Sequence, residues 1–102
     1  MTEEDKIAQL QVFERAAELF SVLSTPIRLR VISALCDGEK NVSELLGAID
    51  VSQPNMSQQL NMMYRAGVLA KRRDGAHIFY RVADETAMLV CKSVCTQMAI
   101  DG

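Results

Sequence analysis

The sequence lacks the features that several large classes of protein require. No apolar run is long enough to cross a bilayer, and the N-terminus carries Glu3, Glu4 and Asp5 where a secretory signal would be basic. There is no Cys-x-x-Cys motif, no glycine-rich cofactor loop and no histidine close in sequence to a cysteine. These absences argue against a membrane protein, a secreted protein and a thiol enzyme. We therefore expect a cytoplasmic protein that is not an enzyme.

Cysteine is present in an odd number, which excludes complete pairing within one chain. The three residues, Cys36, Cys91 and Cys95, do not have the spacing of a disulfide framework. In a reducing compartment such cysteines are free thiols. The chain is thus expected to carry three thiols that are available for chemistry or for packing.

An excess of positive charge is also missing, because the net charge is −2. The charge is nevertheless unevenly distributed. Between Arg65 and Arg81 there are five basic residues and one acidic residue. Neutralisation of phosphates depends on such local charge, so an acidic protein can still bind nucleic acid.

The 102 residues are enough for one small domain, residues 1–102, in which 49% of the residues are apolar. Residues 2 to about 22 predict one helix with an unusually wide apolar face. A face so wide must be covered on more than one side, which predicts a dimer interface. The central stripe of that face consists of Ile7, Leu10, Phe13, Ala17 and Phe20.

Three further helices are predicted before residue 67. Ser24 or Thr25 and Pro26 begin a helix that ends before Asp37, and its inward residues are predicted to be Ile27, Val31, Ala34 and Leu35. A short helix runs from about Val42 or Ser43 to Ile49, with Ser43 as a possible cap. The next helix lies within Ser52–Ala66 and places Met56, Leu60, Met63 and Tyr64 towards the core. Two short helices joined by a tight turn predict a helix-turn-helix.

The opposite face of the helix within Ser52–Ala66 carries uncharged hydrogen-bonding side chains instead of the usual Glu and Lys. They are Asn55, Ser57, Gln58, Gln59 and Asn61. Amides present a donor beside an acceptor, which matches base edges in the major groove of DNA. The pattern predicts a DNA recognition helix, and the alternative is an ordinary polar surface helix.

After Gly67, which is expected to end the helix in a left-handed conformation, the pattern changes to strands. Residues 68–73 and 76–82 are predicted strands joined by Asp74-Gly75, a strong hairpin signal. A last helix is predicted from Asp84 or Glu85 to about Ile100. The fold class is thus mainly α with a β-hairpin wing: a winged helix-turn-helix of order α-α-α-α-β-β-α, with a homodimer formed through the first and last helices.

The chain resembles the ArsR/SmtB family of bacterial winged-helix repressors over nearly its whole length. The resemblance lies in residues 23–32 (LSTPIRLRVI), 51–60 (VSQPNMSQQL), 66–69 (AGVL) and 72–80 (RRDGAHIFY). It implies a homodimer that binds operator DNA, an imperfect palindrome, and is released by an inducer. One departure is Gln59, where such helices commonly carry histidine in Ser-x-His-Leu.

The amide-rich helix and the basic hairpin together give a set of expected DNA contacts. The helix would enter the major groove while the wing reaches the backbone or minor groove, and the helix N-terminus would hold a phosphate. These candidates are Ser52, Gln53, Asn55, Ser57, Gln58, Gln59, Lys71, Arg72, Arg73 and His77.

The sensor candidates are the three thiols. Cys91 and Cys95 lie four residues apart and so share a helix face. In the sulfide- and persulfide-sensing branch of the family, a thiol of the second helix and one of the last helix become bridged by sulfur. Those family positions fall on Ser33 and Ala99 here, but Cys36 is one turn later and Cys95 one turn earlier. If the two helices run antiparallel, these shifts compensate, so Cys36 is predicted to meet Cys91 or Cys95.

Several alternatives remain open at this point. Three thiolates could bind trivalent arsenic or another soft heavy metal as an inducer, through Cys36, Cys91 and Cys95. Nitrogen and oxygen sites for zinc or nickel are not expected, because His77 is the single histidine. The cysteines could instead be structural, in a winged-helix repressor or in a protein-binding adaptor. No resident cofactor is expected.

Overall fold

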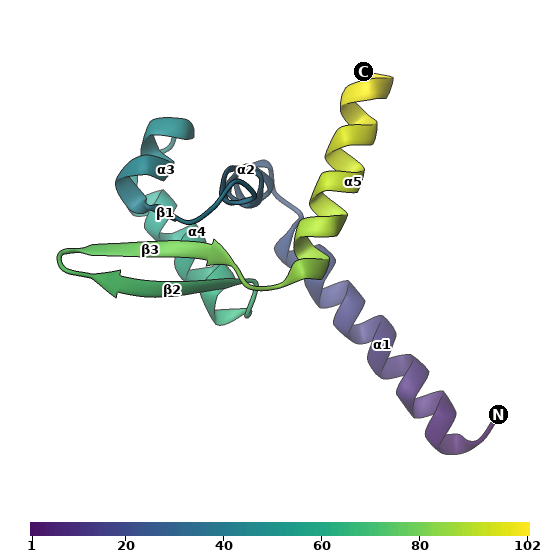
Figure 1. The fold of residues 1–102 in the computed structure, drawn as a ribbon. Helices are drawn as coiled ribbons and strands as arrows, with labels where there is room; N and C mark the ends of the chain where they lie inside the picture. The colour runs from purple at the N-terminus through teal and green to yellow at the C-terminus, as the bar shows by residue number, and fades with distance from the viewer.

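The computed structural model describes residues 1–102, which form five helices and three short strands (Figure 1). The elements, in chain order, are α1 (Glu3–Val22), α2 (Pro26–Leu35), β1 (Lys40–Asn41), α3 (Val42–Ala48), α4 (Gln53–Arg65), β2 (Leu69–Asp74), β3 (His77–Val82) and α5 (Glu85–Asp101). All the predicted helices and both hairpin strands are present. β1 was not predicted, because two residues carry no detectable periodicity. None of the helices has the length and apolar character needed to cross a membrane.

Each helix begins where a polar side chain can accept a hydrogen bond from its first turn. Thr25 caps α2 beside Pro26, and Ser52 caps α4. The predicted cap of α3, Ser43, is wrong. Asn41 holds that place: its Oδ1 accepts from the Glu44 N–H at 2.8 Å, while the Glu44 carboxylate accepts from the Asn41 N–H at 3.0 Å. This reciprocal capping box begins the helix at Val42.

The three strands form one antiparallel sheet in the order β1-β3-β2. The hairpin pairs Leu69 with Val82 at its base and Asp74 with His77 at its tip. Gly75 in the turn has φ +63°, as the Asp-Gly signal requires. Gly67, with φ +79°, ends α4 in the predicted left-handed conformation. α4 and the β-hairpin are therefore joined by one short, well-defined turn.

The core lies where α2, α3 and α4 meet the base of the sheet. Its fully buried side chains include Val31, Leu45, Met56, Leu60 and Met63, and it holds no polar residue. Burial of this apolar surface is the main stabilising contribution to the fold.

Two predictions about the core are wrong. Ile27 is only half-buried, and Ile32 is fully buried in its place. Tyr64 is 41% exposed, and its ring lies 4.3 Å from the Lys71 Nζ atom. The start of the wing thus occupies the space beside Tyr64, and a cation–π contact replaces burial.

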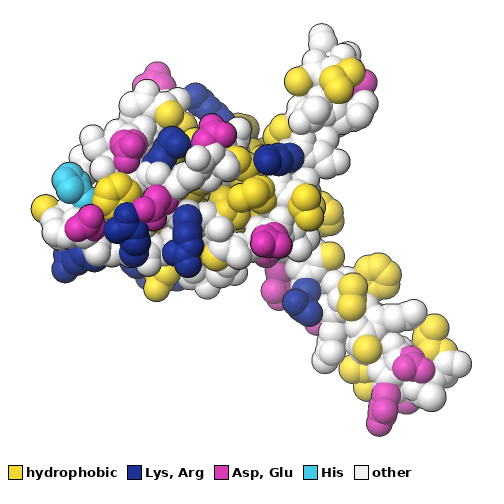
Figure 2. All heavy atoms as spheres, viewed as in Figure 1, with side chains coloured by type: hydrophobic (Ala, Val, Ile, Leu, Met, Phe, Trp, Pro, Cys, Tyr) yellow, Lys and Arg dark blue, Asp and Glu magenta, His cyan; other side chains and the backbone are white.

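α1 and α5 leave the globular part of the molecule as two diverging arms (Figure 1). Both arms carry exposed apolar side chains along their length (Figure 2). The most exposed are Leu10, Val12, Phe13, Phe20, Leu89, Met98 and Ile100. α5 packs on α2 and β3 through buried residues such as Ala87 and Cys91, but the apolar side chains on the outer parts of both arms remain uncovered. An uncovered apolar surface of this extent is typical of a protein–protein interface.

Candidate nucleic-acid interface and thiol cluster

The outer face of α4 presents its polar side chains to solvent. Ser57, Gln58 and Asn61 are exposed, whereas Asn55 and Gln59 are half-buried. The Ser52 hydroxyl accepts a hydrogen bond from the Asn55 N–H at 3.2 Å, which fixes the first turn of the helix. The positive end of the helix dipole and its free N–H groups lie at this exposed end. This face can donate hydrogen bonds to both phosphates and base edges.

Gln59 does not point outward with its neighbours. Its Oε1 accepts a hydrogen bond from Arg28 Nη1 at 3.2 Å, and its Nε2 donates to Asn55 Oδ1 at 3.1 Å. Arg28 was not among the candidate residues, because it lies 31 positions away and nothing local in the sequence indicates this contact. Gln59 is therefore held within the protein, between α2 and the first turn of α4.

The basic residues of the wing differ in how they are held. All of the candidates Lys71, Arg72, Arg73 and His77 are exposed. Arg72 forms an ion pair with Glu39, lies 3.8 Å from Asp74 Oδ2 and stacks 4.7 Å from the centre of the Phe79 ring. The guanidinium hydrogen bond lowers the pKa of Glu39, and the same contact raises the pKa of Arg72. Glu39, which the sequence did not single out, thus places a negative charge beside the wing.

The three cysteines line one small pocket between α2 and α5. The pocket has a volume of about 270 Å³ and is lined by Ser33, Cys36, Asp37, Cys91, Lys92, Cys95 and Thr96. α2 is seen nearly end-on while α5 lies across the view, so the two helices cross (Figure 1). The antiparallel arrangement, on which the compensation of the two cysteine shifts depended, is not present. Cys36 is the C-cap residue of α2, so the crossing still brings the end of that helix to α5.

The two cysteines of α5 differ in burial: Cys91 lies in the core and Cys95 faces solvent. The Sγ atoms of Cys91 and Cys95 are 3.8 Å apart, and the Cys91 thiol donates to the Leu29 carbonyl at 3.7 Å. Burial raises the pKa of Cys91 to about 11, and its hydrogen bond with Cys95 acts in the same direction. Cys95 is exposed and Cys36 is half-buried. No group of three Cys, His, Asp or Glu side chains is arranged closely enough to hold a metal ion.

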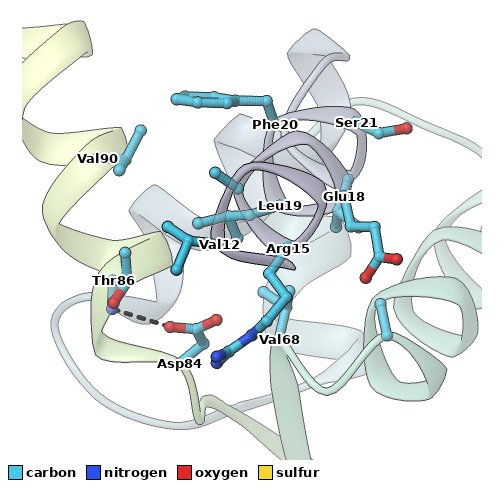
Figure 3. Close-up of a pocket in the computed structure, with 13 residues that line it drawn as sticks. Val12, Arg15, Glu18, Leu19, Phe20, Ser21, Val68, Asp84, Thr86 and Val90 are labelled. Carbon is cyan, nitrogen blue, oxygen red and sulfur yellow. Dashed lines mark hydrogen bonds between the residues drawn. The ribbon is translucent and has the colours of Figure 1, made fainter. Parts of the chain in front are cut away.

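A larger groove lies between the two arms. Its volume is about 840 Å³, and its walls come from α1, the start of α5 and the segment after α4. Its apolar lining includes Val12, Leu19 and Val90, and Arg15 and Asp84 lie at its edge (Figure 3). The groove belongs to the apolar surface of the arms and contains none of the candidate DNA contacts or thiols.

Comparison with known proteins gives a consistent result. Residues 25–71 match the model of the bacterial regulatory protein, arsR family. The biofilm growth-associated repressor of Agrobacterium fabrum is 40% identical over 77 residues, which cover 72% of this chain and 66% of that protein. The chain thus spans slightly less than two thirds of the length of this curated relative.

Solved structures extend the similarity to nearly the whole chain. The crystal structure of the transcriptional repressor BigR from Xylella fastidiosa has a TM-score of 0.78 and 34% identity, covering 94% of this chain and 95% of that one. The structure of Rv0081 from Mycobacterium tuberculosis has a TM-score of 0.74 and 33% identity, covering 88% and 94%. The similarity includes the arms as well as the helix-turn-helix.

Proposed function

The chain belongs to the ArsR family of bacterial regulatory proteins, and on that premise we propose that it is a transcriptional repressor released from operator DNA by a thiol-directed signal. The observation that carries the proposal is the meeting of all three cysteines in one pocket on α2 and α5. Both helices connect the thiols to other functional elements. α2 packs on α4, which carries the proposed DNA contacts, and α5 is one of the two arms of the proposed dimer interface.

DNA binding is assigned to the outer face of α4 and to the wing. Asn55, Ser57 and Gln58 would enter the major groove, and Ser52 and Gln53 would meet a phosphate at the helix N-terminus. Lys71, Arg73 and His77 would lie along the backbone or the minor groove. Arg72 would contact phosphate when the phosphate displaces Glu39 from the guanidinium. Gln59 would act indirectly, by holding Asn55 through its hydrogen bond.

A homodimer would complete the DNA-binding surface. Leu10 and Phe13 on α1 and Met98 on α5 are all more than half exposed. Packing the arms of two copies together would remove this surface from water. The two-fold symmetry would then present two α4 helices to successive major grooves, which is the arrangement that reads an imperfect palindrome.

The signal would act first on Cys95, the exposed thiol of the pocket. With a polysulfide, the Cys95 thiolate attacks a sulfane sulfur, so that Cys95 becomes a persulfide and a shorter polysulfide anion leaves. A second thiol, from Cys36 or Cys91, then attacks Cys95 Sγ. An S–S bond forms, and HS⁻ leaves with the proton of the attacking thiol. Cys91 is the slower partner, because its raised pKa keeps it protonated.

Release would follow from the position of the bridge. A covalent link from Cys36 to α5 draws the end of α2 against the arm, and α2 supports α4. A change in the separation of the two recognition helices removes phosphate contacts. The loss of a few such contacts lowers affinity by about 10- to 1,000-fold at physiological salt.

The test uses a DNA duplex that the reduced protein selects from a randomised library. Binding of the protein to this duplex is measured by fluorescence anisotropy. Release by a polysulfide donor, with a mass change showing a bridge within one subunit, supports the proposal. Cys36→Ala and Cys95→Ala variants should bind the duplex and resist release. Release by arsenite alone, with all three thiols protected from alkylation, would assign the pocket to a thiophilic ion. If neither reagent changes binding, the thiols are structural.

A further inference from the structure

One guanidinium joins the end of α1 to the recognition helix. Arg28, in the first turn of α2, donates from Nε to the Val22 carbonyl at 2.6 Å and from Nη2 to the Ser21 carbonyl at 3.5 Å. Its Nη1 donates to Gln59 Oε1 at 3.2 Å and also contacts the Met62 sulfur. The planar group thus has acceptors on two different helices.

The contact with α1 has a clear physical reason. The last carbonyls of a helix lack partners within the helix and carry partial negative charge. α1 has no basic residue of its own in its last turn. Arg28 supplies a donor to the Val22 carbonyl and the positive charge, and it adds a further donor to the Ser21 carbonyl, which already accepts from the Ser24 N–H and hydroxyl. These contacts fix the position of its rigid fork.

The contact with α4 determines which way two amides face. A guanidinium can only donate, so Gln59 must turn its Oε1 towards Arg28. The Nε2 of Gln59 is thereby directed to Asn55, whose Oδ1 accepts at 3.1 Å. Asn55 consequently uses its oxygen within the protein, and its Nδ2 group remains to donate to DNA. The acceptors it could meet in the major groove are guanine N7 and O6, adenine N7 and thymine O4.

We infer that Arg28 is a positioning residue for operator recognition, which sets the base preference of Asn55 through Gln59. The inference rests on the proposed DNA-binding function. It implies that the end of α1 contributes to operator recognition through Arg28. A change at the dimer interface that moves Ser21 and Val22 would shift Arg28 and thereby alter the orientation of Asn55. No substitution of a DNA-facing residue would be needed.

The test compares affinities for the library-selected duplex and for the same duplex with its site shuffled. Arg28→Lys keeps the charge but loses the fork. Gln59→Glu keeps an acceptor for Arg28 but cannot donate to Asn55. Each variant should reduce the ratio of the two affinities by about tenfold, which corresponds to one base contact. The double variant should lose no more than the larger single loss, because both changes break one chain of contacts.

Asn61→Asp is the matched control. It places the same added negative charge on the exposed face of α4, outside the Arg28 chain, and should weaken both duplexes equally. Circular dichroism establishes that each variant is folded. If Arg28→Lys does not fold, Gln59→Glu decides the question alone, since it retains the Arg28 contacts.

The two possible failures are distinguishable. A wild-type protein that binds neither duplex, or binds both equally, contradicts the proposed function and this inference with it. A selective wild-type protein whose folded variants keep the same selectivity overturns the inference alone and leaves Arg28 as a structural cap of α1.

Discussion

The Sγ atoms of Cys91 and Cys95 lie 3.8 Å apart on successive turns of α5, yet only one of them meets solvent. Cys91 is 2% exposed and donates to the Leu29 carbonyl, whereas Cys95 faces outward. Burial favours the neutral thiol over the thiolate, and the thiolate is the reactive form. Two neighbouring residues of the same type therefore have different chemistry.

We expect Cys95 to be alkylated much faster than Cys91. With a pKa of about 11, Cys91 at pH 8 holds a thiolate fraction on the order of 100-fold below that of a thiol at the ordinary value of 9.0. Timed treatment with iodoacetamide, followed by peptide mass spectrometry, measures both rates. In guanidinium chloride the difference should disappear. Equal rates in the folded protein would show that Cys91 is not protected.

The raised pKa of Cys91 also predicts a loss of stability in alkali. The unfolded chain ionises this thiol near pH 9.0, while the folded protein keeps it protonated up to about pH 11. The folded state binds this proton more tightly than the unfolded chain. The resulting contribution to the free energy of unfolding is complete below pH 9 and declines as the pH rises to 11. The loss is at most about 3 kcal/mol.

Urea unfolding of the reduced protein at pH 8.5 and pH 10.5 tests this prediction against Cys91→Ala. The wild type should lose more stability over this interval than the variant, whose packing defect does not depend on pH. Cys95→Ala, which retains the buried thiol, should keep most of the wild-type pH dependence. Parallel losses in wild type and Cys91→Ala would contradict the assignment.

Replacing Phe13 with Glu should weaken the dimer. Phe13 is 69% exposed on the arm α1, and burying such a side chain against a second copy contributes about 1.5–3 kcal/mol. Sedimentation equilibrium should show a dissociation constant raised at least about tenfold. Gln11→Glu, at an exposed polar position of the same helix, is the control. An unchanged association of Phe13→Glu would place the interface elsewhere.

On the recognition helix, Gln58→Ala should relax sequence preference. The side chain is exposed on the outer face of α4, and a base contact contributes about 1–3 kcal/mol of discrimination. Anisotropy titrations should show roughly tenfold weaker binding to the selected duplex and little change with the shuffled one. Equal weakening of both would mean that Gln58 meets the backbone.

In the wing, two variants should act in opposite directions. Arg73→Ala removes a free positive charge, so all duplexes should bind less tightly and the salt slope should fall by about one. Glu39→Gln removes the carboxylate that pairs with Arg72, so the guanidinium becomes available to phosphate and binding should strengthen. Salt titrations with the shuffled duplex measure both effects. Weaker binding by Glu39→Gln would indicate that the pair is needed to shape the wing.

The sequence by itself determined the helix boundaries and the hairpin, because their causes are local. Thr25 with Pro26, Ser52 with Pro54 and Asp74-Gly75 act through hydrogen bonds and backbone angles within a few residues. The composition of the α4 face and the fold class could be predicted for the same reason. The prediction of Ser43 as the cap of α3 was wrong, because a second local signal, the capping box of Asn41 and Glu44, begins the helix two residues earlier in the sequence than Ser43 would.

Only the tertiary structure decided which distant side chains meet. β1 exists because β3 offers it an edge, and Tyr64 meets Lys71 because β2 packs against α4. Arg28 reaches Gln59, and Glu39 holds Arg72, across more than 30 residues. The packing of α2 on α5 places Cys36 in one pocket with Cys91 and Cys95, and Cys91 is buried. Such contacts depend on how whole elements pack, and no spacing within one segment encodes them.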